Sequence, residues 1–239
     1  MQGGERDNPE PAAAFFVKPS YRDTRFRTKL RCGGPVELRS SDGGEGRAPD
    51  PGLDAEVSHP GSKIGSQRRF EVENIWRSVV WQQFSASIDM LENALLACPD
   101  GLWSDASQKP QFRFWYLVYH TVFYLDVYSS DSLQTFAPPA PFTLSELDPA
   151  GVLPERVYTK DELQTYLDYG RRKCRAMIES LSDEKAQQRC GFEWERDLSV
   201  AELVLDNLRH VQHHVAQLNL LLRQRTGSAP RWVSKSATA

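Results

Sequence analysis

The fold is decided by the stretch LSVAELVLDNLRHVQHHVAQLNLLLRQ, residues 198–224. Its apolar residues return at alternating steps of four and three, which is the spacing of one buried face on an α-helix. The residues of this face are Val204, Leu208, Val211, Val215, Leu218 and Leu222. A capping-box pattern at Ser199 and Glu202 predicts where the helix begins. We expect the helix to end near Arg225.

Three further stretches show helical periodicity and complete the predicted fold. They run from about Val72 to Ala97, from about Gln111 to Tyr128, and from a capping box at Thr159 and Glu162 to about Leu181. The second stretch is apolar or aromatic on nearly all sides, which is typical of a helix surrounded by other helices. No segment alternates with a period of two for long enough to predict a sheet. The sequence therefore predicts an all-α protein, a four-helix bundle.

The N-terminal region has a different composition. Residues 1–65 contain ten of the 15 glycines and seven of the 15 prolines, with few large apolar side chains. Such a segment buries too little apolar surface to offset its ordering entropy. We therefore expect a disordered N-terminal extension over residues 1–67, the helical domain over residues 68–228, and a flexible tail over residues 229–239. An organellar transit peptide is the alternative for the first region, because arginines cluster in it.

Composition and charge exclude several classes of protein. The chain has 239 residues and a formal net charge of −3, which argues against a nucleic-acid-binding surface. No apolar run approaches the roughly 18–20 residues of a membrane span, and no secretory signal is visible. The four cysteines lack CxxC spacing, so a thiolate zinc site is not indicated. We expect a cytoplasmic protein without nucleic-acid or membrane partners.

Two histidines of the 198–224 helix indicate a metal site. His210 and His214 lie one turn apart at the edge of the apolar face, turned towards a neighbouring helix, whereas His213 projects to the opposite side and should meet water. An i, i+4 pair places two imidazoles about 6 Å apart, close enough to share a metal ion. A stable catalytic site usually needs three ligands.

His120, in the middle of the most apolar helix, is the candidate third ligand. A lone buried histidine is more often a hydrogen-bonded core residue. Three inward histidines without partners would cost several kcal/mol of desolvation, and a divalent metal would satisfy them. Three histidines leave at least one coordination position open, as in catalytic metal sites. Zinc, nickel and iron all accept imidazole, so the residues do not choose the metal.

Three residues are candidates to orient these ligands. Asp206 lies one turn before His210, and Gln217 lies three residues after His214, so either could hydrogen-bond an imidazole. Tyr124, one turn beyond His120, could place a hydroxyl near the metal. The alternatives are solvated boundary positions for the first two and core packing for Tyr124. The zincin pattern HExxH is absent, because Val211 stands where its glutamate would be.

The pair in RHVQHHVAQL, followed by Gln217, together with the single His120 in FWYLVYHTVFYLDVY, resembles the DinB/YfiT-like metalloenzyme family. The resemblance covers roughly residues 70–225. It implies an up-down-down-up four-helix bundle that holds a divalent metal through His120, His210 and His214. The chain departs from the family's frequent HRGQ at the last ligand, where it reads HVAQ. Characterised relatives include S-transferases that use low-molecular-weight thiols such as bacillithiol and mycothiol, and a mycothiol-dependent isomerase.

The sequence and this resemblance together predict a divalent-metal-dependent enzyme of the thiol S-transferase or hydrolase type. Its partner would be a small-molecule substrate, such as a low-molecular-weight thiol. The proline-rich connection from Ser129 to Tyr158 could cover the site and shape the substrate pocket. The alternative is a non-catalytic metal-binding or stress-response bundle that acts through a partner or as a homodimer.

Overall fold

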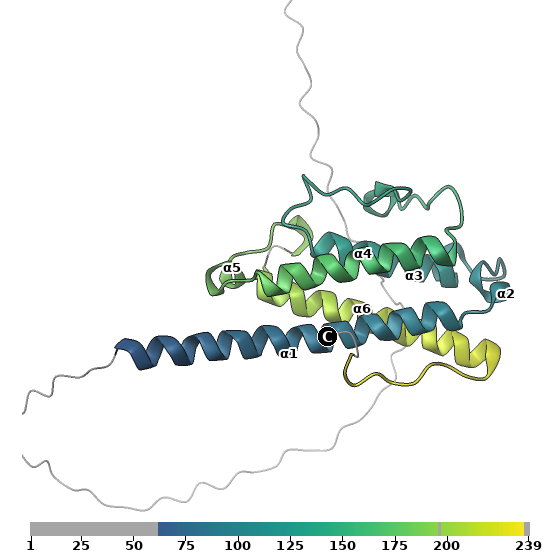
Figure 1. The fold of residues 1–239 in the computed structure, drawn as a ribbon. Coiled ribbons are helices and arrows are strands. Elements are labelled where there is room, and N and C mark those ends of the chain that lie inside the picture. Colours follow the sequence, from purple (N-terminus) through teal and green to yellow (C-terminus); the bar gives the residue numbers. More distant parts are fainter. Residues whose placement is uncertain (1–61, 196, 237–239) are drawn as a thin grey trace, which may run out of the picture.

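The computed structural model describes residues 62–195 and 197–236, with side chains from residue 75 onward. Every regular element in these ranges is helical, apart from one isolated β-bridge between Arg189 and Ser199. The all-α expectation is therefore confirmed for this part of the chain (Figure 1). Most of the region expected to be disordered, residues 1–61, lies outside the described residues.

Four long helices form the main body of the protein. They are α1 (Ser62–Ala97), α3 (Phe114–Tyr128), α4 (Lys160–Glu179) and α6 (Val200–Thr226). The shorter elements are α2 (Asp100–Trp103), α5 (Asp183–Gln187) and the 3-10 helices η1 (Pro110–Phe112), η2 (Leu144–Leu147) and η3 (Glu193–Glu195). Within the described ranges, no helix has the length and hydropathy that crossing a bilayer requires.

The four predicted helices are present, and two of their boundaries differ from expectation. α1 begins at Ser62 rather than near Val72, because the intervening residues include the helix-favouring Lys, Gln, Arg and Glu, although they carry no apolar stripe. The last residues of the region expected to be disordered therefore belong to α1. α3 begins at Phe114 rather than Gln111, because Pro110 opens the separate turn η1.

Both predicted capping boxes are present at the helix starts. The Thr159 hydroxyl accepts a hydrogen bond from the Glu162 N–H, and the Glu162 carboxylate accepts one from the Thr159 N–H at 2.8 Å. Ser199 and Glu202 make the same pair of bonds at the start of α6. α6 closes on Gly227, whose φ of 78° is left-handed and favours glycine. Local hydrogen bonding therefore fixes both ends of the helix that carries two of the histidines.

α3 is the most enclosed of the long helices. α1 packs against α4 and α6, and α3 packs against the same two helices (Figure 1). Every residue of α3 is buried except Tyr116 and His120. These two residues lie one turn apart, and His120 faces the histidines of α6.

The connection between α3 and α4, residues 129–159, is anchored to the helices by aromatic and aliphatic side chains. Phe142 is buried, and its ring stacks on that of Tyr166 with the centroids 4.3 Å apart. The ring centroid of Tyr158 lies 4.7 Å from that of Phe142. Leu147, the last residue of η2, is buried as well. Phe142 before η2 and Leu147 at its end therefore hold η2 in a defined position.

The described part of the C-terminal tail lies against α1. The Ser236 hydroxyl donates a hydrogen bond to the Asp89 carboxylate of α1 at 2.6 Å. Val233 packs against the hydrophobic core. Both contacts lie in the described part of the 229–239 tail, which ends at residue 236.

Asp126 of α3 places a fully buried carboxylate between α3 and α4. It accepts hydrogen bonds from the Lys173 ammonium and from the Tyr166 hydroxyl, the latter at 2.9 Å. Burial raises the pKa of Asp126, whereas the hydrogen bond and charge of Lys173 act in the opposite direction. The ion pair thus offsets the desolvation of the carboxylate and ties α3 to α4.

Removing the counter-charge of Asp126 should destabilise the fold. We expect Lys173→Met to lower the free energy of unfolding by about 3 kcal/mol, the low end for a broken buried pair, since the lysine side chain is 25% exposed. Lys185→Met is the matched control, because Lys185 pairs with the exposed Asp131 and should change stability by about 0.5 kcal/mol or less. Urea unfolding followed by circular dichroism measures both variants. Equally small losses in the two variants would contradict this role of the Asp126 pair.

Candidate metal centre

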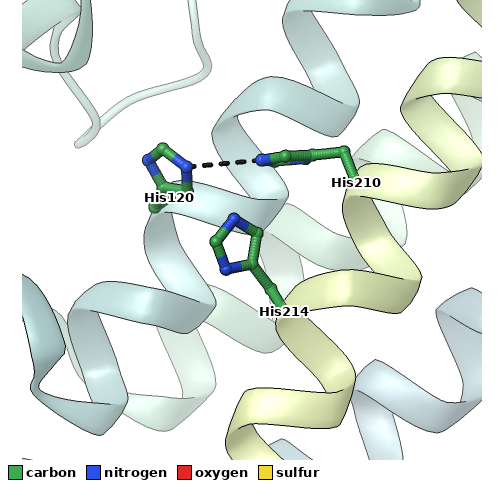
Figure 2. A group of neighbouring side chains, drawn as sticks. All are labelled: His120, His210 and His214. Carbon is green, nitrogen blue, oxygen red and sulfur yellow. Dashed lines mark hydrogen bonds between the residues drawn. The ribbon is translucent and has the colours of Figure 1, made fainter. Parts of the chain in front are cut away.

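Three histidines converge between α3 and α6. His120 comes from α3, whereas His210 and His214 come from α6. Each offers one ring nitrogen, and these atoms all lie within 4.8 Å of one another. The Nε2 atoms of His120 and His210 are 3.3 Å apart, and His214 directs a ring nitrogen towards the space beside them (Figure 2). The structure therefore brings together the three histidines singled out from the sequence.

Helix geometry and helix packing each supply part of this cluster. His210 and His214 are one turn apart on α6, and their ring centroids are 4.6 Å apart. Packing of α3 on α6 brings the ring of His120 to 5.3 Å from that of His210 and 4.9 Å from that of His214. His213 is exposed, as expected for a residue on the opposite side of the helix.

Gln217, one of the residues predicted to orient a ligand, contacts His214. Its Oε1 lies 2.7 Å from Nδ1 of His214, and its Nε2 lies 3.2 Å from Nε2 of His213. Because an amide oxygen can only accept, the Nδ1–H of His214 is the donor. The neutral ring therefore keeps a lone pair on Nε2, the nitrogen turned towards the other histidines.

Glu146 makes the corresponding contact to His120. Its Oε2 lies 2.8 Å from Nδ1 of His120, and its side chain is only 3% exposed. The residue belongs to η2, so the connection between α3 and α4 reaches the cluster, as expected. No pattern in the sequence indicates Glu146 itself. The sequence indicates only that the connection between α3 and α4 could cover the site. It does not indicate which residue of the connection contacts a histidine.

The other two residues predicted to orient ligands lie differently. Asp206 pairs with Arg209 on the same helix, at 3.6 Å between oxygen and nitrogen. The ring of Tyr124 packs against the cluster, with centroid distances of 4.8 Å to His120 and 5.5 Å to His210. Tyr124 is therefore part of the wall of the site, and an orienting role for either residue stays a prediction.

The surroundings keep His214 and two neighbouring tyrosines uncharged. Burial, followed by the charge of His120, lowers the pKa of His214 to about 3. Burial raises the pKa of the Tyr116 and Tyr124 phenols, and the Glu146 carboxylate adds to both shifts. At neutral pH, His214 is therefore a neutral imidazole with an available lone pair, and the two phenols keep their protons.

The described cysteines have the properties of structural residues. Cys98, Cys174 and Cys190 are free and buried, and Cys32 lies outside the described residues. Burial raises the pKa of Cys98 and Cys174 to about 12. Both of these thiols stay protonated at neutral pH, which does not suit a nucleophile.

The donor set fits a divalent metal ion. Two of the rings have their Nδ1 atoms engaged by an acceptor, which leaves Nε2 to face the cluster. Neutral imidazole is a ligand for zinc, nickel and iron. Three protein ligands leave at least one position for water or substrate. The cluster could therefore hold a metal of this kind, and its donor atoms do not distinguish among the three.

Comparison with known proteins gives one family. The model of the DinB superfamily matches residues 83–218, a span that includes all three histidines and more than half of the chain. Neither the curated proteins nor the solved structures provide a match. The family resemblance seen in the sequence is therefore confirmed.

The hydrogen-bond partners predict the protonation of the rings in the metal-free protein. Nitrogen-15 NMR should place the proton of both His120 and His214 on Nδ1. His214 should stay neutral when the pH falls from about 7.5 to about 5, because its folded-state pKa is near 3, well below the ordinary value of about 6.5. The His214→Gln variant assigns the signal. A proton on Nε2 of His214, or its protonation by pH 5, would contradict the geometry.

Proposed function

The chain belongs to the DinB superfamily, and we propose that it is a divalent-metal-dependent enzyme of the thiol S-transferase or hydrolase type. The ligands in this proposal are His120, His210 and His214. The observation that carries it is the convergence of three ring nitrogens within 4.8 Å of one another, from two helices that are far apart in sequence.

The chain's own residues prepare this site for an ion. Glu146 and Gln217 accept hydrogen bonds from the outer nitrogens of His120 and His214, so these rings are held with Nε2 facing inwards. The ring of Tyr124 packs beside the cluster. A divalent ion bound there would act as a Lewis acid and lower the pKa of a water or thiol at its open position.

The proposed substrate is a small molecule, and in the transferase alternative it is a low-molecular-weight thiol. Burial keeps Cys98 and Cys174 protonated, so neither of these two supplies a thiolate. In this proposal the reacting sulfur belongs to the substrate. A cytoplasmic location, where such thiols are kept reduced, is part of the same proposal.

The finer description of the fold is also a proposal: an up-down-down-up four-helix bundle. Two observations support it. Each of α1 and α3 packs against both α4 and α6, as in a ring of four helices. The 129–159 connection is long enough to return the chain to the start of a parallel neighbour, whereas short loops join antiparallel ones.

A non-catalytic role through a partner or a homodimer is the second candidate. It is favoured by the exposed apolar side chains of α1, where Ile75 and Val79 lie one turn apart and are 62% and 54% exposed. Such a stripe is suited to contact with another helix.

Metal uptake tests the proposed ligands. Protein purified without a His tag should take up about one zinc ion per chain, and His210→Ala should lose it, because two imidazoles remain. His213→Ala is the matched control on the same helix and should keep the ion, since His213 is exposed. Elemental analysis after dialysis measures both. A wild-type protein that takes up neither zinc, nickel nor iron would refute the proposal.

Turnover separates the enzyme from the binding protein. With metal loaded, the conjugation of a low-molecular-weight thiol to an electrophile should proceed in the wild type and fall by about 100-fold or more in His120→Ala. Circular dichroism establishes that the variant is folded. If metal-loaded wild-type protein reacts no faster than the variant with either thiol or hydrolysis substrates, the enzyme proposal is contradicted. The non-catalytic role is then the one that remains.

A further inference from the structure

We propose that Glu146 is a positioning residue for the metal centre, which fixes the ring of His120 and couples the ion to the connection between α3 and α4. The inference rests on the proposed metal-binding function. It concerns a residue that the sequence patterns did not indicate and that would not itself bind the ion. Its effect would act through the histidine.

The contact between Glu146 and His120 has the geometry of such a role. The carboxylate Oε2 lies 2.8 Å from Nδ1, on the side of the ring away from His210, whose Nε2 is 3.3 Å from Nε2 of His120. Figure 2 shows the two nitrogens of His120 pointing in different directions, one towards His210 and the other away from it. A carboxylate on the outer nitrogen orients the ring and makes the inner nitrogen a better ligand.

Glu146 is held in place by its own turn. Phe142 and Leu147, on either side of it, are each only 8% exposed. The hydroxyl of Tyr119 donates a hydrogen bond to the carbonyl oxygen of Thr143 at 3.2 Å and ties the start of the turn to α3. The carboxylate is therefore presented to His120 by a packed segment rather than by a free loop.

The Glu146 side chain is only 3% exposed, and its ion-pair contact is with a proposed metal ligand. Over residues 75–195 and 197–236, His120 is the only ion-pair partner of Glu146. A buried carboxylate is favourable only when it is hydrogen-bonded and paired with positive charge. A divalent ion on the opposite nitrogen of the same ring would provide that charge one imidazole away.

The coupling must act in both directions. If the carboxylate strengthens ion binding, the ion must stabilise the carboxylate in its buried position by the same factor. The turn that carries Glu146 would then be held more firmly in the loaded protein. His214 lacks this device, because its partner Gln217 is neutral and belongs to α6 itself.

The test compares zinc affinity in Glu146→Gln, Glu146→Ala and Glu155→Gln. Glu155→Gln is the matched control, since Glu155 lies exposed in the same connection. Competition with a chromophoric chelator should show zinc affinity about tenfold lower in Glu146→Gln and between about tenfold and 100-fold lower in Glu146→Ala. The control should stay within about twofold. The visible absorption of bound Co²⁺ should change in the two Glu146 variants alone.

Hydrogen exchange gives a readout of the coupling. Zinc should slow the exchange of the backbone amides of residues 142–148 in the wild type and in Glu155→Gln, but not in Glu146→Ala. Thermal melting without metal reports any purely structural role of Glu146. Such a role would lower the melting temperature of the Glu146 variants and leave their zinc affinity unchanged. That result would overturn the inference while leaving the metal site intact. A wild type that binds no zinc, nickel or iron would overturn the metal site and the inference together.

Discussion

The packing of α3 against α6 is the interaction on which the site depends. α6 alone places His210 and His214 one turn apart, but two imidazoles are too few for a catalytic metal site. His120 completes the set because its ring on α3 faces α6, which brings the Nε2 atoms of His120 and His210 to 3.3 Å. That distance is set by the core that encloses α3, so the stability of the fold and the geometry of the cluster share one origin.

Hydrogen bonds on the outer nitrogens orient two of the three histidine rings. Glu146 reaches His120 from the connection between α3 and α4, and Gln217 reaches His214 from the next turn of α6. One partner is a carboxylate from a distant segment, whereas the other is an amide from the same helix. In the proposed metal centre, the carboxylate would join the state of the site to the position of the turn that carries it, which a local contact on one helix cannot do.

Much of this architecture could be predicted from the sequence, because it depends on local rules. The capping boxes at Thr159 and Ser199, and the one-turn spacing of His210 and His214, require only helix geometry. The early start of α1 at Ser62 was missed, because a helix can continue without an apolar stripe. Glu146 was missed for a different reason. Its place beside His120 follows from the course of a long connection, which is fixed by contacts such as Phe142 on Tyr166 that no periodicity encodes.

The central claim is that one ion sits where the three rings meet. The most direct measurement is an anomalous difference map, recorded at the absorption edge of zinc from crystals of zinc-loaded protein. The account predicts a single peak bonded to Nε2 of His120, His210 and His214, each at about 2.0–2.1 Å. A peak elsewhere on the chain, or ordered rings with no peak among them, would contradict it.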